Sequence, residues 1–133
     1  MAIRTQLSLR LPNSPGALSG ICRLLSDERV SIIAMMLDES GTLRLIVDNQ
    51  ILAAGMLREH HHQVTTKDVL VVRVSNYPGA FAPVVKLVSD AGFNVEYAYG
   101  STSEDTTGKP GAVGAVVVLG VDDAMRAAAA TGV

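Results

Sequence analysis

"NSPGALSGICRLLSD", residues 13–27, returns 63 positions later as "NYPGAFAPVVKLVSD", residues 76–90. Between residues 10–27 and 73–90, eight of eighteen positions are identical, and most others exchange like for like, as Ile21 does with Val84. An internal duplication of this kind indicates that one supersecondary unit occurs twice. Each copy places a Pro-Gly turn before an apolar helix.

Strand patterns surround both copies. Before the first, "TQLSLRL" alternates polar and apolar residues, and before the second, "VLVVRV" is almost wholly apolar. Further strands are expected over residues 30–38 and 93–99. "TLRLIVDNQILAAGML" and "AVVVLGVDDAMRAAAA" then match at an offset of 74 and add a strand and a helix to each unit, with Asp48 and Asp122 as expected N-caps. The eleven extra residues of the second unit lie within "GSTSEDTTGKPGAVG", an expected hairpin loop.

This order of elements resembles the ACT domain. The resemblance is carried by "LPNSPGALSGICRLLSDERVSI" and "VSNYPGAFAPVVKLVSDAGFNVEYAYG" and covers nearly the whole chain as two tandem units, residues 1–65 and 66–133. Small stand-alone tandem ACT proteins are the most similar kind. The resemblance implies an α+β, ferredoxin-like fold, with an antiparallel sheet and helices on one face. It also implies regulatory binding of small molecules, most often amino acids.

The chain departs from the family pattern at the fourth strand. By the offset of 74, Val133 corresponds to Glu59, so the second unit ends before a fourth strand could begin. If a strand over 64–74 lies antiparallel beside one over 3–11, each fills the other's fourth-strand position, giving one six-stranded sheet with a pseudo-twofold axis. The alternative is a short fourth strand at 62–66, with the last strand supplied by a partner chain or missing.

In both arrangements, the strands at 30–38 and 93–99 become sheet edges. Unpaired apolar edges are prone to association, so we expect a homodimer through them. The apolar residues on these edges are Ile32, Ile33, Met35, Met36, Tyr97 and Tyr99.

The Pro-Gly turns are the candidate ligand sites. Because proline is tolerated only in a first helical turn, Pro83 places one helix start near Gly79 or Ala80, and the duplication places the other near Gly16 or Ala17. The first amide N–H groups of each helix then have no intrahelical acceptor. Such donors, at the positive end of a helix dipole and beside a glycine, suit a carboxylate.

Asn13 and Asn76 add an acceptor and two donors each, enough to reach an α-ammonium as well as an α-carboxylate. The resemblance implies that the second strand of a neighbouring module completes each site, through residues 32–36 or 95–99, with Glu96 as an ammonium partner. The candidate ligand-binding residues are Asn13, Ser14, Gly16, Ala17, Leu18, Asn76, Tyr77, Gly79, Ala80, Phe81, Ile33 and Glu96. The competing interpretation is turn chemistry alone, because Pro, Gly and Asn are common in turns.

The composition of the chain narrows the possible binding partners and cellular locations. A formal charge of −2 argues against nucleic acid, and Cys22, the single cysteine, excludes an internal disulfide and indicates a reducing compartment. The apolar runs fall short of the roughly 20 residues of a membrane helix. The start of the chain lacks a signal-peptide pattern. These features predict a cytoplasmic protein without membrane contact.

No residue pattern supports catalysis. The three adjacent histidines of "REHHHQ" point in different directions on a helix, so we interpret them as a solvated helix end rather than a metal site. No activated nucleophile, acid–base pair or P-loop is present, and we expect no enzyme activity, metal or cofactor. The sequence predicts a regulatory module that binds a free amino acid and signals to an enzyme or transporter. The alternative is an interaction or oligomerisation scaffold without a ligand.

Overall fold

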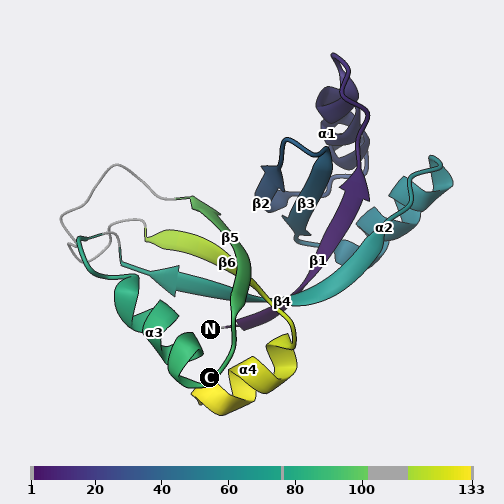
Figure 1. The fold of residues 1–133 in the computed structure, drawn as a ribbon. Helices are drawn as coiled ribbons and strands as arrows, with labels where there is room; N and C mark the ends of the chain where they lie inside the picture. The colour runs from purple at the N-terminus through teal and green to yellow at the C-terminus, as the bar shows by residue number, and fades with distance from the viewer. Residues whose placement is uncertain (1, 76, 102–113, 133) are drawn as a thin grey trace. The chain divides into compact units, whose positions relative to one another are not determined.

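A computed structural model describes residues 2–75, 77–101 and 114–132. Strands and helices follow the expected order, with two strand-helix-strand-strand-helix repeats (Figure 1). Residues 102–113 of the expected hairpin loop lie outside the described residues. The elements are β1 (Ala2–Arg10), α1 (Ala17–Asp27), β2 (Ile32–Leu37), β3 (Thr42–Val47), α2 (Gln50–Glu59), β4 (Thr65–Val74), α3 (Ala82–Asp90), β5 (Val95–Ser101), β6 (Ala115–Val121) and α4 (Ala124–Thr131).

The chain forms two compact units. The N-terminal unit comprises Thr5–Lys67, and the C-terminal unit comprises Met1–Arg4 together with Asp68–Val133. Each unit therefore contains the beginning of a strand whose remainder belongs to the other unit.

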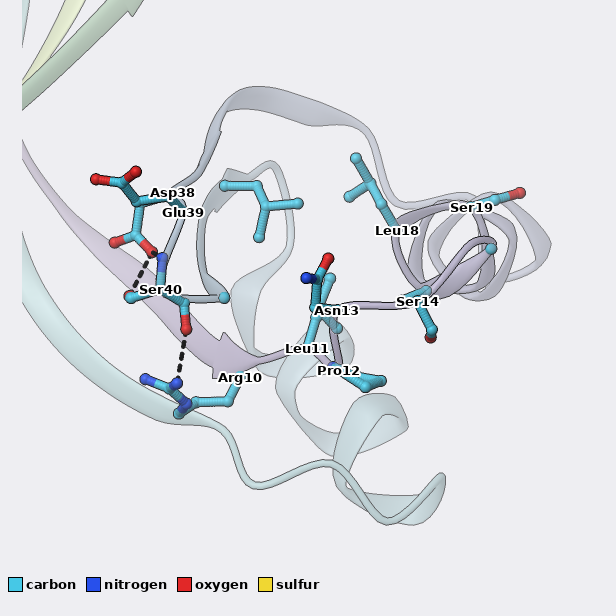
Figure 2. Close-up of a pocket in the computed structure, with 14 residues that line it drawn as sticks. Arg10, Leu11, Pro12, Asn13, Ser14, Leu18, Ser19, Asp38, Glu39 and Ser40 are labelled. Carbon is cyan, nitrogen blue, oxygen red and sulfur yellow. Dashed lines mark hydrogen bonds between the residues drawn. The ribbon is translucent and has the colours of Figure 1, made fainter.

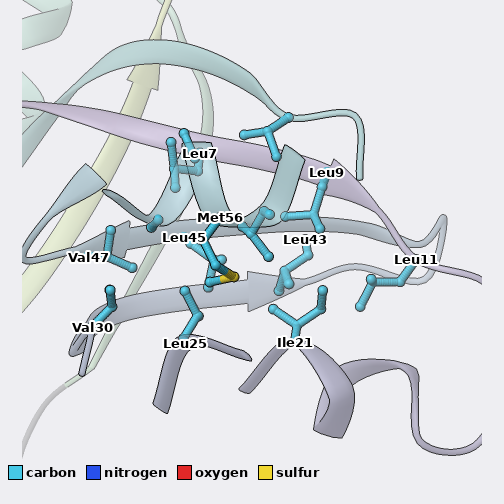
Figure 3. Packing of buried hydrophobic residues seen from close by; sticks show 14 residues of the cluster. Leu7, Leu9, Leu11, Ile21, Leu25, Val30, Leu43, Leu45, Val47 and Met56 are labelled. Carbon is cyan, nitrogen blue, oxygen red and sulfur yellow. The ribbon is translucent and has the colours of Figure 1, made fainter. Parts of the chain in front are cut away.

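The N-terminal unit packs two helices on one face of its strands. β3 pairs antiparallel with β1, where Leu9 faces Leu43, and with β2. The alternating leucines of β1 and β3 share a face, and α1 and α2 cover it with apolar side chains (Figure 3). The core contains Leu7, Leu9, Leu11, Ile21, Leu25, Val30, Leu43, Leu45, Val47, Ala53, Ala54, Met56, Leu57 and Val64.

The C-terminal unit repeats this plan with smaller side chains. β6 pairs antiparallel with β4, where Val71 faces Val118, and with β5, where Ala98 faces Leu119. α3 contributes Val88 to the core, whereas α4 contributes only alanines. The core contains Leu70, Val72, Val88, Leu119, Val121, Ala124, Ala127 and Ala128.

The fourth-strand position is filled by exchange, as the sequence predicted. The hydrogen-bonded strand order is β2-β3-β1-β4-β6-β5, so β1 and β4 are neighbours in one six-stranded sheet. In the N-terminal unit, the Thr65 hydroxyl donates to the Ser8 carbonyl at 3.5 Å. The alternative of a short separate strand at 62–66 is wrong, because β4 begins at Thr65 and runs without interruption to Val74.

One helix start differs from expectation. α1 begins at Ala17 as predicted, but α3 begins at Ala82, with Phe81 as its N-cap and Pro83 in its first turn. The delay has a local cause: the Gly20 amide donates to the Gly16 carbonyl at 2.9 Å at the start of α1, whereas the matching residue, Pro83, has no amide hydrogen to donate to Gly79.

The N-caps of the second helices each lie one residue beyond the predicted aspartates. Asn49 accepts from the Leu52 amide at 3.2 Å, and Asp123 accepts from the Arg126 amide at 3.0 Å. Asp48 instead accepts from the Ser31 amide at 3.0 Å and so joins the end of β3 to the start of β2. Among the described residues, no helix has the length and apolar character that a bilayer crossing requires.

Candidate functional site

A cavity of about 490 Å³ lies in the N-terminal unit, between the β1–α1 loop and the turn that joins β2 to β3. Figure 2 shows Asn13, Ser14 and Leu18 on the helix side and Asp38, Glu39 and Ser40 on the turn side. Its volume is within the range of small-molecule sites, roughly 300–1,000 Å³.

The helix side of the cavity presents main-chain donors. Gly16 enters α1 with φ +87°, and no side chain caps the helix. The Ala17 amide is used by the turn, donating to the Ser14 carbonyl at 3.3 Å, whereas within the described residues the amides of Gly16, Leu18 and Ser19 have no acceptor. All three of these residues line the cavity. Because the helix dipole adds positive potential there, the position suits an anionic group.

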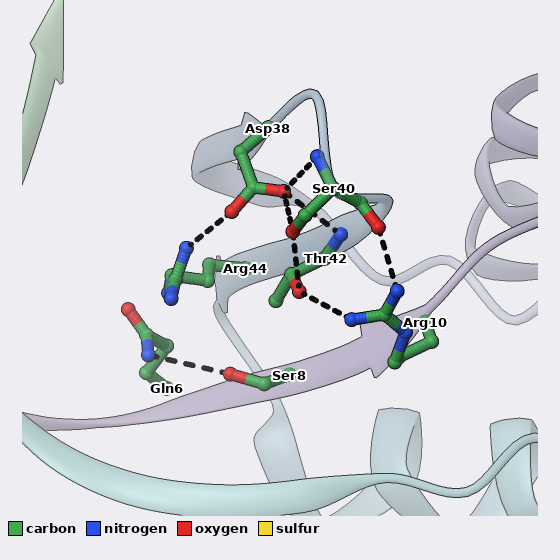
Figure 4. Close-up of polar contacts among 7 residues, drawn as sticks. All are labelled: Gln6, Ser8, Arg10, Asp38, Ser40, Thr42 and Arg44. Atoms are coloured by element: carbon green, nitrogen blue, oxygen red, sulfur yellow. Dashed lines mark hydrogen bonds and ion pairs between the residues drawn. The ribbon is translucent and has the colours of Figure 1, made fainter. Parts of the chain in front are cut away.

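The turn side is ordered by Asp38 (Figure 4). Its carboxylate accepts from the Ser40 and Thr42 amides at 3.0 Å and from the Ser40 hydroxyl, and it forms an ion pair with Arg44 at 3.2 Å. These contacts, the Ser40 hydroxyl foremost, lower the pKa of Asp38 to about 2. Asp38 is thus ionised at neutral pH, but its oxygens are occupied, so its role is to shape the turn.

Two hydrogen bonds fix this turn against the end of β1. The Leu11 amide donates to the Gly41 carbonyl at 2.8 Å, and the Arg10 guanidinium donates to the Ser40 carbonyl at 2.6 Å. Gly41 has φ +91°, and a Cβ there would lie 2.8 Å from the Leu11 carbonyl oxygen. Only glycine fits this position, and the two walls of the cavity are held together by hydrogen bonds to main-chain carbonyls of the turn.

Glu39 supplies the exposed charge on the turn side. Its carboxylate has no partner within the described residues, and the residue lines the cavity. In Figure 2 the carboxylates of this turn point away from Asn13 and Leu18, so Glu39 reaches a positively charged ligand group only after its exposed side chain rotates. With that rotation, main-chain donors on one wall and a carboxylate on the other match the opposite charges of a zwitterion. Glu39 was not among the residues predicted from the sequence. The signal was the turn-forming "DESG" that follows β2, but nothing in the pattern indicated that this turn lies beside the β1–α1 loop.

The predicted residues of the first loop come together in this cavity, which Asn13, Ser14, Gly16, Ala17 and Leu18 all line. Ile33 lies on β2 of the same unit but does not line it, and Glu96 lies on β5 of the C-terminal unit. The involvement of these two residues stays a prediction.

The second loop repeats the turn of the first. Gly79 has φ +84°, and the Ala80 amide donates to the Tyr77 carbonyl as the Ala17 amide donates to Ser14. Tyr77 is half exposed and Phe81 packs against the C-terminal core. Asn76 lies outside the described residues. Across the parts of the chain that the structure describes, no group of three His, Cys, Asp or Glu side chains is placed to hold a metal ion.

The chain belongs to the ACT domain pair family, whose model matches residues 1–128. Domains of this family are regulatory modules, typically ones that bind amino acids. No curated protein sequence matches the chain.

Solved structures agree with this assignment. Protein BT0572 from Bacteroides thetaiotaomicron superposes with a TM-score of 0.84 at 27% identity, covering 98% of this chain and 87% of that one. The ligand-free regulatory subunit of aspartate kinase from Thermus thermophilus gives a TM-score of 0.66 at 16% identity, covering 98% and 92%. The corresponding subunit from Thermus flavus gives 0.59 at 14% identity, covering 98% and 94%. The two kinase subunits share the fold.

Proposed function

We propose that this protein is a regulatory module that binds a free amino acid in the cavity beside Gly16. The ligand carboxylate accepts hydrogen bonds from the amides of Gly16, Leu18 and Ser19. The ligand ammonium lies toward Glu39 and the Asn13 side chain. The observation that carries this proposal is the set of helix-terminal amides without acceptors that line one cavity, with the exposed acidic residue Glu39 on the turn opposite them.

Binding of an amino acid is expected to stabilise the fold. A ligand at 100 times its Kd adds about 2.7 kcal/mol to the free energy of unfolding, which is about 10 °C or more in Tm for a unit of this size. A thermal-shift screen of the twenty amino acids against the intact chain measures this directly. We expect a saturable response to one amino acid or a small group of them.

Gly16→Val is the variant that tests the location. It places a branched side chain beside the main-chain donors, at a φ that β-branched residues avoid, and the ligand response should disappear. Gly92→Val is the matched control, because Gly92 also has φ +87° and open space around its Cα, but does not line the cavity. A ligand response that survives in Gly16→Val would contradict the proposed location.

A regulatory module acts through another protein, and we propose that this partner is a metabolic enzyme or a transporter. We also propose that the chain forms a homodimer when it contacts this partner. β2 and β5 end the strand order, and Ile32 and Leu37 on β2 are 37% and 41% exposed. These features favour association through the sheet edges. We further propose that the two ACT units meet between residues 65 and 66. We also propose that the protein is located in the cytoplasm.

Light scattering at micromolar concentration tests the dimer. We expect twice the chain mass of 13.9 kDa. Ile32→Lys should shift the mass toward the monomer, because a charged side chain at a sheet edge opposes pairing. Ile51→Lys is the control, because Ile51 is 77% exposed and belongs to helix α2 rather than to an edge strand. A monomeric wild-type chain would overturn the dimer. If no amino acid binds and a specific protein is co-purified, the scaffold interpretation holds instead.

A further inference from the structure

A second cavity in the N-terminal unit is lined by different types of side chain from those of the amino-acid site. It has a volume of about 610 Å³ and is lined mainly by basic and hydroxyl side chains. No Asp or Glu is among its lining residues within the described chain. The polar lining that matters here is Arg10, His61, His62, Ser8, Thr42 and Thr65.

Three elements bring these side chains together. Ser8 and Arg10 are two residues apart on β1 and so share a face, and Thr42 on β3 lies directly opposite Arg10 in the antiparallel register. The segment between α2 and β4 adds the histidines, and the Thr65 hydroxyl contacts the Ser8 carbonyl at 3.5 Å. The cavity is therefore assembled on paired strands rather than on one loop.

Arg10 is oriented before any ligand arrives. Its guanidinium donates to the Ser40 carbonyl at 2.6 Å and to the Thr42 hydroxyl at 3.4 Å (Figure 4). A guanidinium carries five N–H donors, so donors remain beyond these two contacts. A permanently charged group held in place loses less entropy on binding an anion.

His61 occupies a position that usually belongs to glycine. It has φ +68° just after α2, where its amide donates to the Arg58 carbonyl and the His62 amide donates to the Leu57 carbonyl, both at 3.0 Å. This pair of bonds is the Schellman helix ending, whose left-handed residue is most often Gly. A histidine there is less stable than glycine would be, as is Arg29 at the corresponding end of α1, so glycine can replace the imidazole of His61 without loss of fold stability.

We propose that this cavity is an oxyanion-binding site, which takes a phosphate or carboxylate group on Arg10 with support from His61, His62 and the hydroxyls. A metal ion does not fit, because the fixed positive charge of Arg10 repels cations and the lining offers no carboxylate. The inference does not depend on the amino-acid site, although Arg10 borders both cavities.

Calorimetric titration of the intact chain with inorganic phosphate and, separately, with acetate tests the site, each against sodium chloride of equal ionic strength. We expect saturable binding, with amide resonance shifts at Ser8 and Thr65. Tighter binding of phosphate identifies a phosphate group as the occupant, and tighter binding of acetate identifies a carboxylate. Both outcomes support an oxyanion site.

Two variants with the same change in net charge distinguish anion binding at this site from a general effect of charge. Arg10→Gln should weaken anion binding about tenfold or more, as expected for the loss of a charge-assisted hydrogen bond. Arg23→Gln, an equal charge change on the exposed face of α1, should leave it unchanged. His61→Gly should weaken binding while keeping or raising Tm, so that a loss of binding is not confused with unfolding.

Three results would overturn the proposal. They are no saturable binding of either anion, equal effects of Arg10→Gln and Arg23→Gln, or zinc binding that depends on His61. Gly16→Val should leave phosphate binding intact, so the failure of one site is distinguishable from failure of the other.

Discussion

At the residue scale, the site depends on glycines that no other residue replaces without cost. Gly16 turns the chain into α1 at positive φ and leaves the main chain accessible, because no atom outside its immediate neighbours lies within 4 Å of where its Cβ would be. Gly41 has the opposite surroundings, since its missing Cβ is what allows the turn to approach β1.

Gly41→Ala should therefore destabilise the fold by about 1–3 kcal/mol, because the added Cβ meets the Leu11 carbonyl and the left-handed φ is retained. Urea denaturation measures this change. Gly92→Ala carries the left-handed φ alone, since nothing lies near its missing Cβ, and should cost about 1 kcal/mol. Equal costs for the two variants would show that the close approach at Gly41 is unimportant.

Asp38 should give the fold a specific acid sensitivity. Its pKa falls from 3.8 to about 2 in the folded chain, so its contribution to stability is fully present above its unfolded pKa and is lost as the pH falls toward 2. Denaturation midpoints measured across this window should fall less steeply in Asp38→Asn than in the wild-type chain. Parallel pH profiles for the two proteins would contradict the role assigned to this carboxylate.

At the element scale, the repeat predicted the order of strands and helices, because hydrophobic periodicity directly reports which face of each element is buried. Helix ends were less predictable. Asp122 and Asp123 are adjacent acidic residues of equal capping propensity, and only the backbone path decides which one reaches the Arg126 amide. The start of α3 shifted for a different reason, since Pro83 has no amide hydrogen to close the first helical turn on Gly79.

Asp123→Ala should destabilise the chain by about 1 kcal/mol through loss of the α4 N-cap. Asp122→Ala, one residue earlier and exposed, should change the free energy of unfolding by less than about 0.5 kcal/mol. Paired thermal denaturation of the two variants tests the assignment. The reverse ranking would place the cap at Asp122.

At the scale of the whole molecule, the exchange of strand ends explains why neither repeat needs a fourth strand of its own. Ala2–Arg4 belong to the C-terminal unit and Thr65–Lys67 to the N-terminal unit. The sequence predicted this arrangement from the offset of 74 between the repeats, together with the fourth strand that the family pattern contains. It did not predict that the turn between β2 and β3 borders the ligand cavity. The Leu11 amide and the Arg10 guanidinium donate to the Gly41 and Ser40 carbonyls, and main-chain acceptors leave no pattern in the sequence.

Removal of residues 1–4 should expose the β4 edge in the C-terminal unit. We expect faster hydrogen exchange for the Asp68–Val72 amides in the shortened chain, while β3 amides in the N-terminal unit serve as the internal reference. Unchanged protection along β4 would show that the exchanged strand end contributes little to that unit.

The central claim is that main-chain donors at the start of α1 bind the carboxylate of an amino acid. Amide resonances followed during titration with the amino acid that raises Tm test it most directly. If the claim is right, the Gly16, Leu18 and Ser19 amide resonances shift downfield together, and the three shift changes saturate with one Kd. Saturable binding that leaves these three amides unmoved would contradict it.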